Sequence, residues 1–150
     1  MAKVIKVKNE EENVIYLLTS NEGIPFLYVN KYLKFLDTIN RSPNTIKSYA
    51  YRLKLYWDFI ELDQLDFKNI SMDVLVKYIG WLQGGSSIRS KKRESNTIND
   101  NVMAVFGFYN YLARFHSEIL DTKLDFYSDS NKKKLLIQIF FRTYKIQCHI

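Results

Sequence analysis

The stretch that begins at Ser42-Pro43 has the clearest periodicity in the chain and constrains its fold most. Its apolar residues recur every three or four positions: Ile46, Tyr49, Ala50, Leu53, Tyr56, Trp57 and Ile60. This spacing predicts a helix with these residues in the core. Ser42 suits the N-cap and Pro43 the first helical position, so the helix is predicted to run to about Glu61. The opposite face is predicted to be exposed and consists of Asn44, Lys47, Ser48, Tyr51 and Asp58.

Three further helices are predicted from the same spacing. One runs from about Pro25 to Asp37, with a core face of Tyr28, Val29, Tyr32, Leu33 and Leu36. Another is capped by Ser71 and ends at Gly84-Gly85, with a core face of Leu75, Tyr78, Ile79 and Leu82. The last spans about Asn96 to Phe115, with a core face of Ile98, Val102, Val105, Tyr109 and Leu112.

The N-terminal segment predicts β-structure. Residues Lys3 to Lys8 and Asn13 to Thr19 are rich in Val, Ile and Tyr and flank a charged turn, which is typical of a hairpin. The expected fold class is therefore mainly α, with four helices and a small N-terminal β-hairpin. We expect a hairpin extension over residues 1–22, a helical domain over 23–116 and a tail over 117–150.

The charge of the chain favours a polyanionic partner. The net charge is +6 and the pI is about 9.3, so nucleic acid is the first candidate. A membrane surface is the second, but it is disfavoured because the best basic cluster lies in a predicted loop rather than on an amphipathic helix. That cluster is Arg89, Lys91, Lys92 and Arg93, and Lys132 to Lys134 form a weaker second patch.

Several chemistries lack the residues they need. A single cysteine, Cys148, cannot form an internal disulfide, and two histidines, His116 and His149, cannot build the usual zinc clusters. We therefore expect no metal site, no cofactor, no small-molecule substrate and no thiol nucleophile. The N-terminus alternates apolar and basic residues instead of forming a signal peptide, and no run is long enough to span a bilayer. A cytoplasmic location is expected.

Two helix openings carry a family resemblance. Arg41-Ser-Pro-Asn-Thr-Ile-Lys-Ser-Tyr49 precedes Leu53 and Trp57, and Ser95-Asn-Thr-Ile-Asn99 precedes Phe108-Tyr-Asn-Tyr-Leu112. Together these segments resemble the paired openings of the core-binding, SAM-like domain of tyrosine recombinases, the phage integrase family. The resemblance covers roughly Gly23 to Phe115. It implies a four-helix domain that forms half of a clamp around duplex DNA, with the second and fourth helices near the major groove.

In that family, a separate domain after the core-binding helices catalyses strand exchange with a tyrosine nucleophile, arginines, a lysine and histidines. The 35 residues after Phe115 contain no Arg-x-x-His or His-x-x-Arg pair followed by a tyrosine. A tyrosine without arginines to neutralise the transferred phosphate would not be activated. We therefore expect no enzymatic activity and no catalytic residue here, and we interpret 117–150 as a truncated linker toward a catalytic domain.

The resemblance also suggests which residues contact DNA. Asn44, Lys47, Ser48 and Tyr51 would reach phosphates and base edges, while Thr45 and Thr97 would place hydroxyls and helix-start amides near phosphates, with Asn96 beside them. Arg89, Lys91, Lys92 and Arg93 would add affinity that depends on salt but reads no sequence. The competing interpretations are a solvated helix face, threonines that only cap their own helices, and a solvated loop.

Two further alternatives stay open. Tyr49, Trp57, Phe108 and Tyr109 could stack on bases, but their positions on or beside the apolar stripes favour packing. The rival function is a helical interaction or regulatory module that pairs with a full-length recombinase protomer. DNA binding would weaken steeply with salt, whereas a protein-pairing surface would bury apolar area and respond less to ionic strength.

Overall fold

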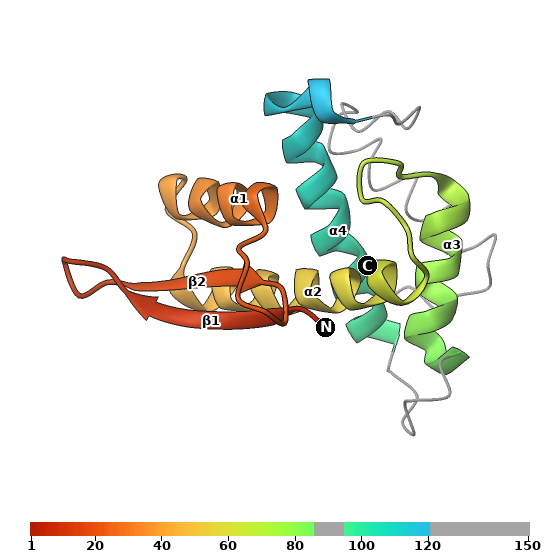
Figure 1. The fold of residues 1–150 in the computed structure, drawn as a ribbon, viewed down its shortest axis with the longest axis horizontal. Helices are drawn as coiled ribbons and strands as arrows, with labels where there is room; N and C mark the ends of the chain where they lie inside the picture. Colours follow the sequence, from red (N-terminus) through yellow and green to blue (C-terminus); the bar gives the residue numbers. More distant parts are fainter. Residues whose placement is uncertain (86–94, 121–150) are drawn as a thin grey trace. The chain divides into compact units, whose positions relative to one another are not determined.

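A computed structural model describes residues 1–85 and 95–120 of the 150-residue chain (Figure 1). The predicted fold class is confirmed, because these residues form four α-helices and a small N-terminal antiparallel hairpin. The chain divides into two compact units, Met1–Leu65 and Asp66–Ile150. Each unit is described by itself.

The predicted hairpin consists of β1 (Lys3–Lys8) and β2 (Val14–Thr19), and the second strand begins one residue later than predicted. Its register pairs Lys3 with Thr19 at one end and Lys8 with Val14 at the other. The side-chain oxygen of Asn9 closes the turn by accepting hydrogen bonds from the backbone amides of Glu11 and Asn13, at 3.0 and 2.8 Å. Asparagine often stabilises turns in this way, so the turn geometry follows from local sequence.

Helix α1 (Leu27–Thr38) begins two residues later than predicted. Pro25 stays extended because it forms an isolated bridge with Thr19, and the amide of Phe26 donates to the carbonyl of Leu18 at 3.0 Å. The predicted core face is confirmed for Val29, Tyr32, Leu33 and Leu36. Tyr28, which we placed on the same face, is only half-buried.

Helix α2 (Pro43–Leu62) has the predicted start and an end one residue beyond the predicted one. Six of its seven predicted core residues are buried: Ile46, Ala50, Leu53, Tyr56, Trp57 and Ile60. Tyr49 is half-buried. The whole run from Tyr56 to Ile60 is buried, so burial here extends beyond a single helical stripe. Helix α2 contacts both strands of the hairpin and α1.

The prediction that Asp58 is exposed is wrong. Only 2% of the residue is accessible, and its carboxylate accepts hydrogen bonds from the backbone amide of Ala2 at 2.8 Å and from the ammonium of Lys54 at 2.7 Å. A buried charge is stable only when it is paired and hydrogen-bonded, and both conditions are met here. Asp58 therefore fastens the start of the hairpin to α2.

In the second unit, α3 (Met72–Gly80) continues into a wider turn, η1 (Trp81–Gly85), and α4 (Ser95–Phe115) is followed by the short turn η2 (Ser117–Ile119). Ser71 caps α3 by accepting from the amide of Val74 at 3.3 Å, as predicted. Gly84 has a φ of 100°, a left-handed conformation that favours glycine, and it ends the helical segment where expected. Every predicted core residue of α3, η1 and α4 is buried.

One hydrogen bond within this unit can be removed by a single substitution. The hydroxyl of Tyr109, a fully buried residue of α4, donates to the carbonyl of Phe67 at 2.7 Å. Replacing Tyr109 with Phe leaves that carbonyl without this donor and is expected to lower the free energy of unfolding by about 1 kcal/mol. Urea titration followed by circular dichroism measures the change.

Tyr51→Phe is the matched control, because the Tyr51 side chain is half accessible and forms no hydrogen bond within the described residues. It should change the free energy of unfolding by less than about 0.5 kcal/mol. Equal effects of the two substitutions would show that the Tyr109 hydroxyl does not stabilise the unit.

Candidate nucleic-acid interface

The opening of α2 is built by two local devices. Asn40, with φ 62°, ends α1 in the left-handed conformation, and the amide of Arg41 then donates to the carbonyl of Leu36 at 3.0 Å. Ser42 follows directly as the N-cap and accepts from the amide of Thr45 at 3.2 Å. The first turn of α2 contains no acidic residue. The positive end of the helix dipole is therefore not neutralised by its own turn, which favours an anion.

The exposed stripe of α2 consists of Asn44, Lys47, Ser48 and Tyr51, which we call the α2 outer face. These residues follow i, i+3, i+4, i+7 spacing, and all four are exposed as predicted. Thr45 lies beside the stripe and is half-buried. The structure thus brings together five of the predicted contact residues within about two turns near the start of one helix.

Two cations at this opening have no counter-ion among the residues that the structure describes. Lys47 and Arg41 are exposed, and neither makes an ion pair with a residue that the structure describes. By contrast, Lys34 lies 3.8 Å from the carboxylate of Asp37, and Lys54 pairs with buried Asp58. Arg41 was missed as a site residue because helical periodicity starts only after the cap. Its place immediately before a Ser-Pro helix start was the available signal.

The hydroxyl groups at this opening are already engaged. Ser48 donates to the carbonyl of Asn44 at 3.0 Å, and the hydroxyls of Ser42 and Thr45 lie 2.8 Å apart. Phosphate oxygens only accept hydrogen bonds, so Ser48 would have to release the Asn44 carbonyl to bind one. The side-chain amide of Asn44 forms no hydrogen bond with any described residue, and it can both donate and accept hydrogen bonds. Lys47, Asn44 and Tyr51 have side chains that form no hydrogen bond or ion pair with a described residue, so they are the best-prepared contacts on the α2 outer face.

The other predicted contacts belong to the second unit or fall outside the described residues. Thr97 is exposed in the first turn of α4, and its backbone carbonyl accepts a hydrogen bond from the side-chain amide of Asn101 at 2.8 Å. Asn96 is also part of this turn. Arg89, Lys91, Lys92 and Arg93, the Lys132–Lys134 patch, Cys148 and His149 all lie outside the described residues.

The aromatic residues weighed as base-stacking platforms are mainly core residues. Phe108 and Tyr109 are fully buried, and Trp57 is 8% exposed. Tyr49 is half-buried, and its ring lies 6.2 Å from the ring of Tyr32 and 5.8 Å from the guanidinium carbon of Arg52. The packing interpretation is confirmed for Trp57, Phe108 and Tyr109.

Residues 1–85 and 95–120 contain no group of three or more His, Cys, Asp or Glu side chains that could hold a metal ion. None of the helices in this part of the chain is both long and apolar enough to cross a membrane.

Comparisons with known proteins agree with the fold and with the helix openings. Residues 29–116 match the family model for the phage integrase N-terminal SAM-like domain. The chain is 37% identical over 107 residues to transposase A from transposon Tn554 of Staphylococcus aureus, in strains Mu50 and N315, which covers 67% of this chain and 30% of each relative. It therefore spans less than a third of the length of these curated relatives. No solved structure matches significantly.

Proposed function

This chain belongs to the phage integrase family, with the N-terminal SAM-like domain at residues 29–116, and on that premise we propose that it binds duplex DNA through the α2 outer face. The observation that carries the proposal is that Arg41 and Lys47, which form no ion pair within residues 1–85 and 95–120, lie at a capped helix start whose first turn contains no acidic residue. Cations and helix-start amides both favour phosphate oxygens.

The second unit would contribute its own contacts. The opening of α4, with Asn96 and Thr97, would approach phosphates, and Arg89, Lys91, Lys92 and Arg93 would supply affinity that reads no sequence. We propose that residues 23–116 form the DNA-binding domain, that residues 1–22 are an extension of it and that residues 117–150 are a linker. These residues would position DNA for recombination or integration in the cytoplasm, and the groups that perform strand exchange would come from elsewhere.

Lys47→Ala tests this assignment by removing one cation from the α2 outer face. The chain is titrated with a labelled duplex at several salt concentrations, and the logarithm of the association constant is plotted against the logarithm of the salt concentration. Losing one phosphate contact should make this slope less steep by roughly 0.9, with a similar loss for every duplex sequence.

The control is Lys34→Ala, which removes the same charge from an exposed position on α1. It should leave the slope within error of the unchanged chain. Equal effects of the two variants would mean that only net charge matters, and the α2 outer face would lose its assignment. Association with a recombinase protomer that is insensitive to salt, without DNA binding, would instead favour the protein-pairing function.

A further inference from the structure

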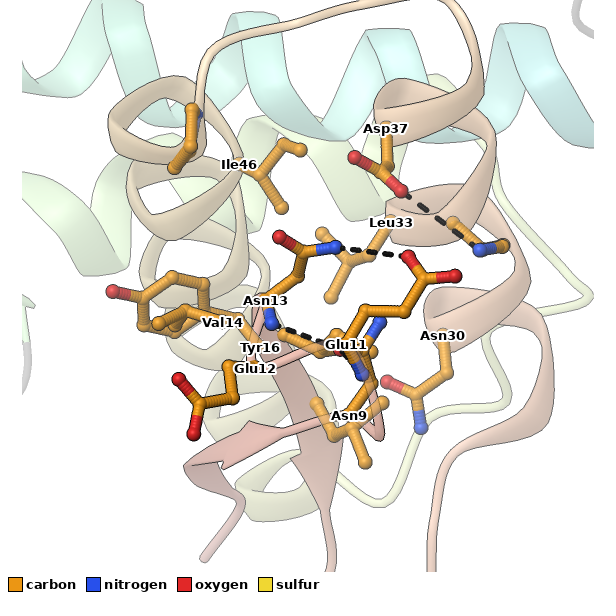
Figure 2. Close-up of a pocket in the computed structure, with 14 residues that line it drawn as sticks. Asn9, Glu11, Glu12, Asn13, Val14, Tyr16, Asn30, Leu33, Asp37 and Ile46 are labelled. Atoms are coloured by element: carbon orange, nitrogen blue, oxygen red, sulfur yellow. Dashed lines mark hydrogen bonds and ion pairs between the residues drawn. The ribbon is translucent and has the colours of Figure 1, made fainter.

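A cleft of about 710 Å³ lies in the first unit between the hairpin turn, β2, α1 and the start of α2 (Figure 2). Its lining includes the apolar side chains of Val14, Leu33 and Ile46 and several carboxylates. The volume is within the range of roughly 300 to 1,000 Å³ that is typical of ligand-binding clefts. None of the four residues of the α2 outer face lines this cleft.

One wall of the cleft is an edge of the sheet. The side-chain amide of Asn30 accepts from the backbone amide of Leu18 at 2.8 Å and donates to its carbonyl at 3.0 Å, and Phe26 also donates to that carbonyl. Both backbone groups of Leu18 therefore point away from β1. Because this direction alternates along a strand, the backbone groups of Tyr16 and Val14 must point to the same side.

The covering of this edge stops before the cleft. Near Leu18, the segment from Ile24 to Phe26 runs alongside β2 like a short third strand, with the bridge between Thr19 and Pro25 at its centre. The chain then turns into α1. No group in the described part of the chain hydrogen-bonds to the outward backbone groups of Tyr16 and Val14, which line the cleft. An unpaired edge of this kind can accept another strand.

The lining of the cleft is acidic, although the whole chain has a net charge of +6. The charged residues in its lining are Glu11, Glu12, Asp37 and Lys34, and Lys34 already pairs with Asp37. The hairpin turn holds Glu12 at a φ of 61°, a conformation that is uncommon for a residue other than glycine. The side-chain amide of Asn13 donates a hydrogen bond to the Glu11 carboxylate at 3.3 Å. Two negative charges therefore remain for a cationic ligand.

We propose that this cleft binds an extended segment of a partner protein that alternates aliphatic residues with Lys or Arg. The segment would add to the open edge of β2 through the backbone groups of Val14 and Tyr16. Its aliphatic side chains would contact Leu33 and Ile46, and its cations would face Glu11 and Glu12. The composition has a precedent in the chain, since β1, with the sequence Lys-Val-Ile-Lys-Val-Lys, pairs with the opposite edge of β2.

The probe is a capped, labelled peptide of the sequence Lys-Val-Ile-Lys-Val-Lys, titrated into the full chain. We expect saturable binding, slower hydrogen exchange at the amides of Tyr16 and Val14, and binding at least about tenfold weaker for a peptide with Glu in place of each Lys. Perturbation of Ile15 and Leu17 instead would mean that the peptide displaces β1, and would overturn addition at the edge.

Two variants separate the backbone contribution from the charge contribution. Tyr16→Pro removes an outward amide that β1 does not use, so it should weaken peptide binding roughly tenfold more than Tyr16→Ala, which removes only the side chain. The pair Glu11→Gln and Glu12→Gln keeps the turn and should weaken binding about threefold or more, with the loss disappearing at high salt. DNA binding should be unchanged in each variant. Peptide binding that none of these changes weakens, or no binding to the unchanged chain, would overturn the proposal.

Discussion

Replacing Asp58 with alanine is expected to lower the free energy of unfolding by about 3 kcal/mol. The side chain is 1% exposed, and its carboxylate accepts hydrogen bonds from the backbone amide of Ala2 and the ammonium of Lys54. Its removal would leave a buried amide without an acceptor and a cation, itself only 30% exposed, without its counter-ion. Chemical denaturation measures the loss.

Two controls distinguish this interaction from charge removal in general. Asp58→Asn keeps an acceptor for Ala2 but loses the ion pair, so it should cost less than Asp58→Ala. Asp37→Ala removes an exposed carboxylate that pairs with Lys34 and should cost less than about 0.5 kcal/mol. If Asp58→Ala and Asp37→Ala were equally mild, Asp58 would not fasten the hairpin to α2.

The largest expected effect on function comes from replacing Arg89, Lys91, Lys92 and Arg93 together with alanine. Each cation that neutralises a phosphate contributes roughly 0.9 to the salt slope, so four contacts would contribute about 3.6. The variant should bind every duplex more weakly, by roughly 100-fold or more at about 0.1 M salt, with little change in preference among sequences. Fluorescence anisotropy over a salt series measures both quantities.

The matched control has the same loss of net charge. In it, alanine replaces four exposed lysines: Lys3, Lys6, Lys68 and Lys77. It should lower affinity much less than the first variant because none of these residues is assigned to the interface. An unchanged salt slope in the first variant would remove Arg89 to Arg93 from the interface, whatever happens to the control.

Helical periodicity predicted most of the fold because the core faces of the helices are continuous stripes. Ile46, Ala50 and Leu53 are buried, as are Val102, Val105 and Leu112, and each set follows helical spacing. Ser42 and Ser71 also act as the caps that local sequence indicates. These features depend on neighbours within a few residues, so the sequence carries them directly.

The features that were missed depend on residues far apart in the chain. Periodicity places Asp58 on the outside of α2, but the hairpin covers that side, and its partner Ala2 lies 56 positions away. Likewise, no residue near Asn30 in the sequence indicates that its side-chain amide forms hydrogen bonds with both backbone groups of Leu18. Lys54 was a usable local signal, because a cation four residues before an aspartate often forms an ion pair within a helix.

The candidate site was predicted in part for the same reason. Asn44, Lys47, Ser48 and Tyr51 share a face because helix geometry requires it. Which of them are free to contact a phosphate could not be predicted. The hydrogen bond that occupies Ser48, and the absence of an ion pair at Lys47 within the described residues, appear only in the folded structure. Arg41 enters the site because the left-handed turn at Asn40 ends α1 immediately before the cap of α2.

DNA binding by the α2 outer face is tested directly by a nuclear magnetic resonance titration of the ¹⁵N-labelled chain with duplex DNA at low and near-physiological salt. If the α2 outer face binds DNA, the largest shifts in the first unit fall on the backbone amides between Arg41 and Tyr51, Pro43 excepted. These shifts weaken as salt increases and spare the exposed positions of α1, such as Lys31 and Lys34. Shifts centred on α1, or no shifts at low salt from a folded chain, would contradict DNA binding by the α2 outer face.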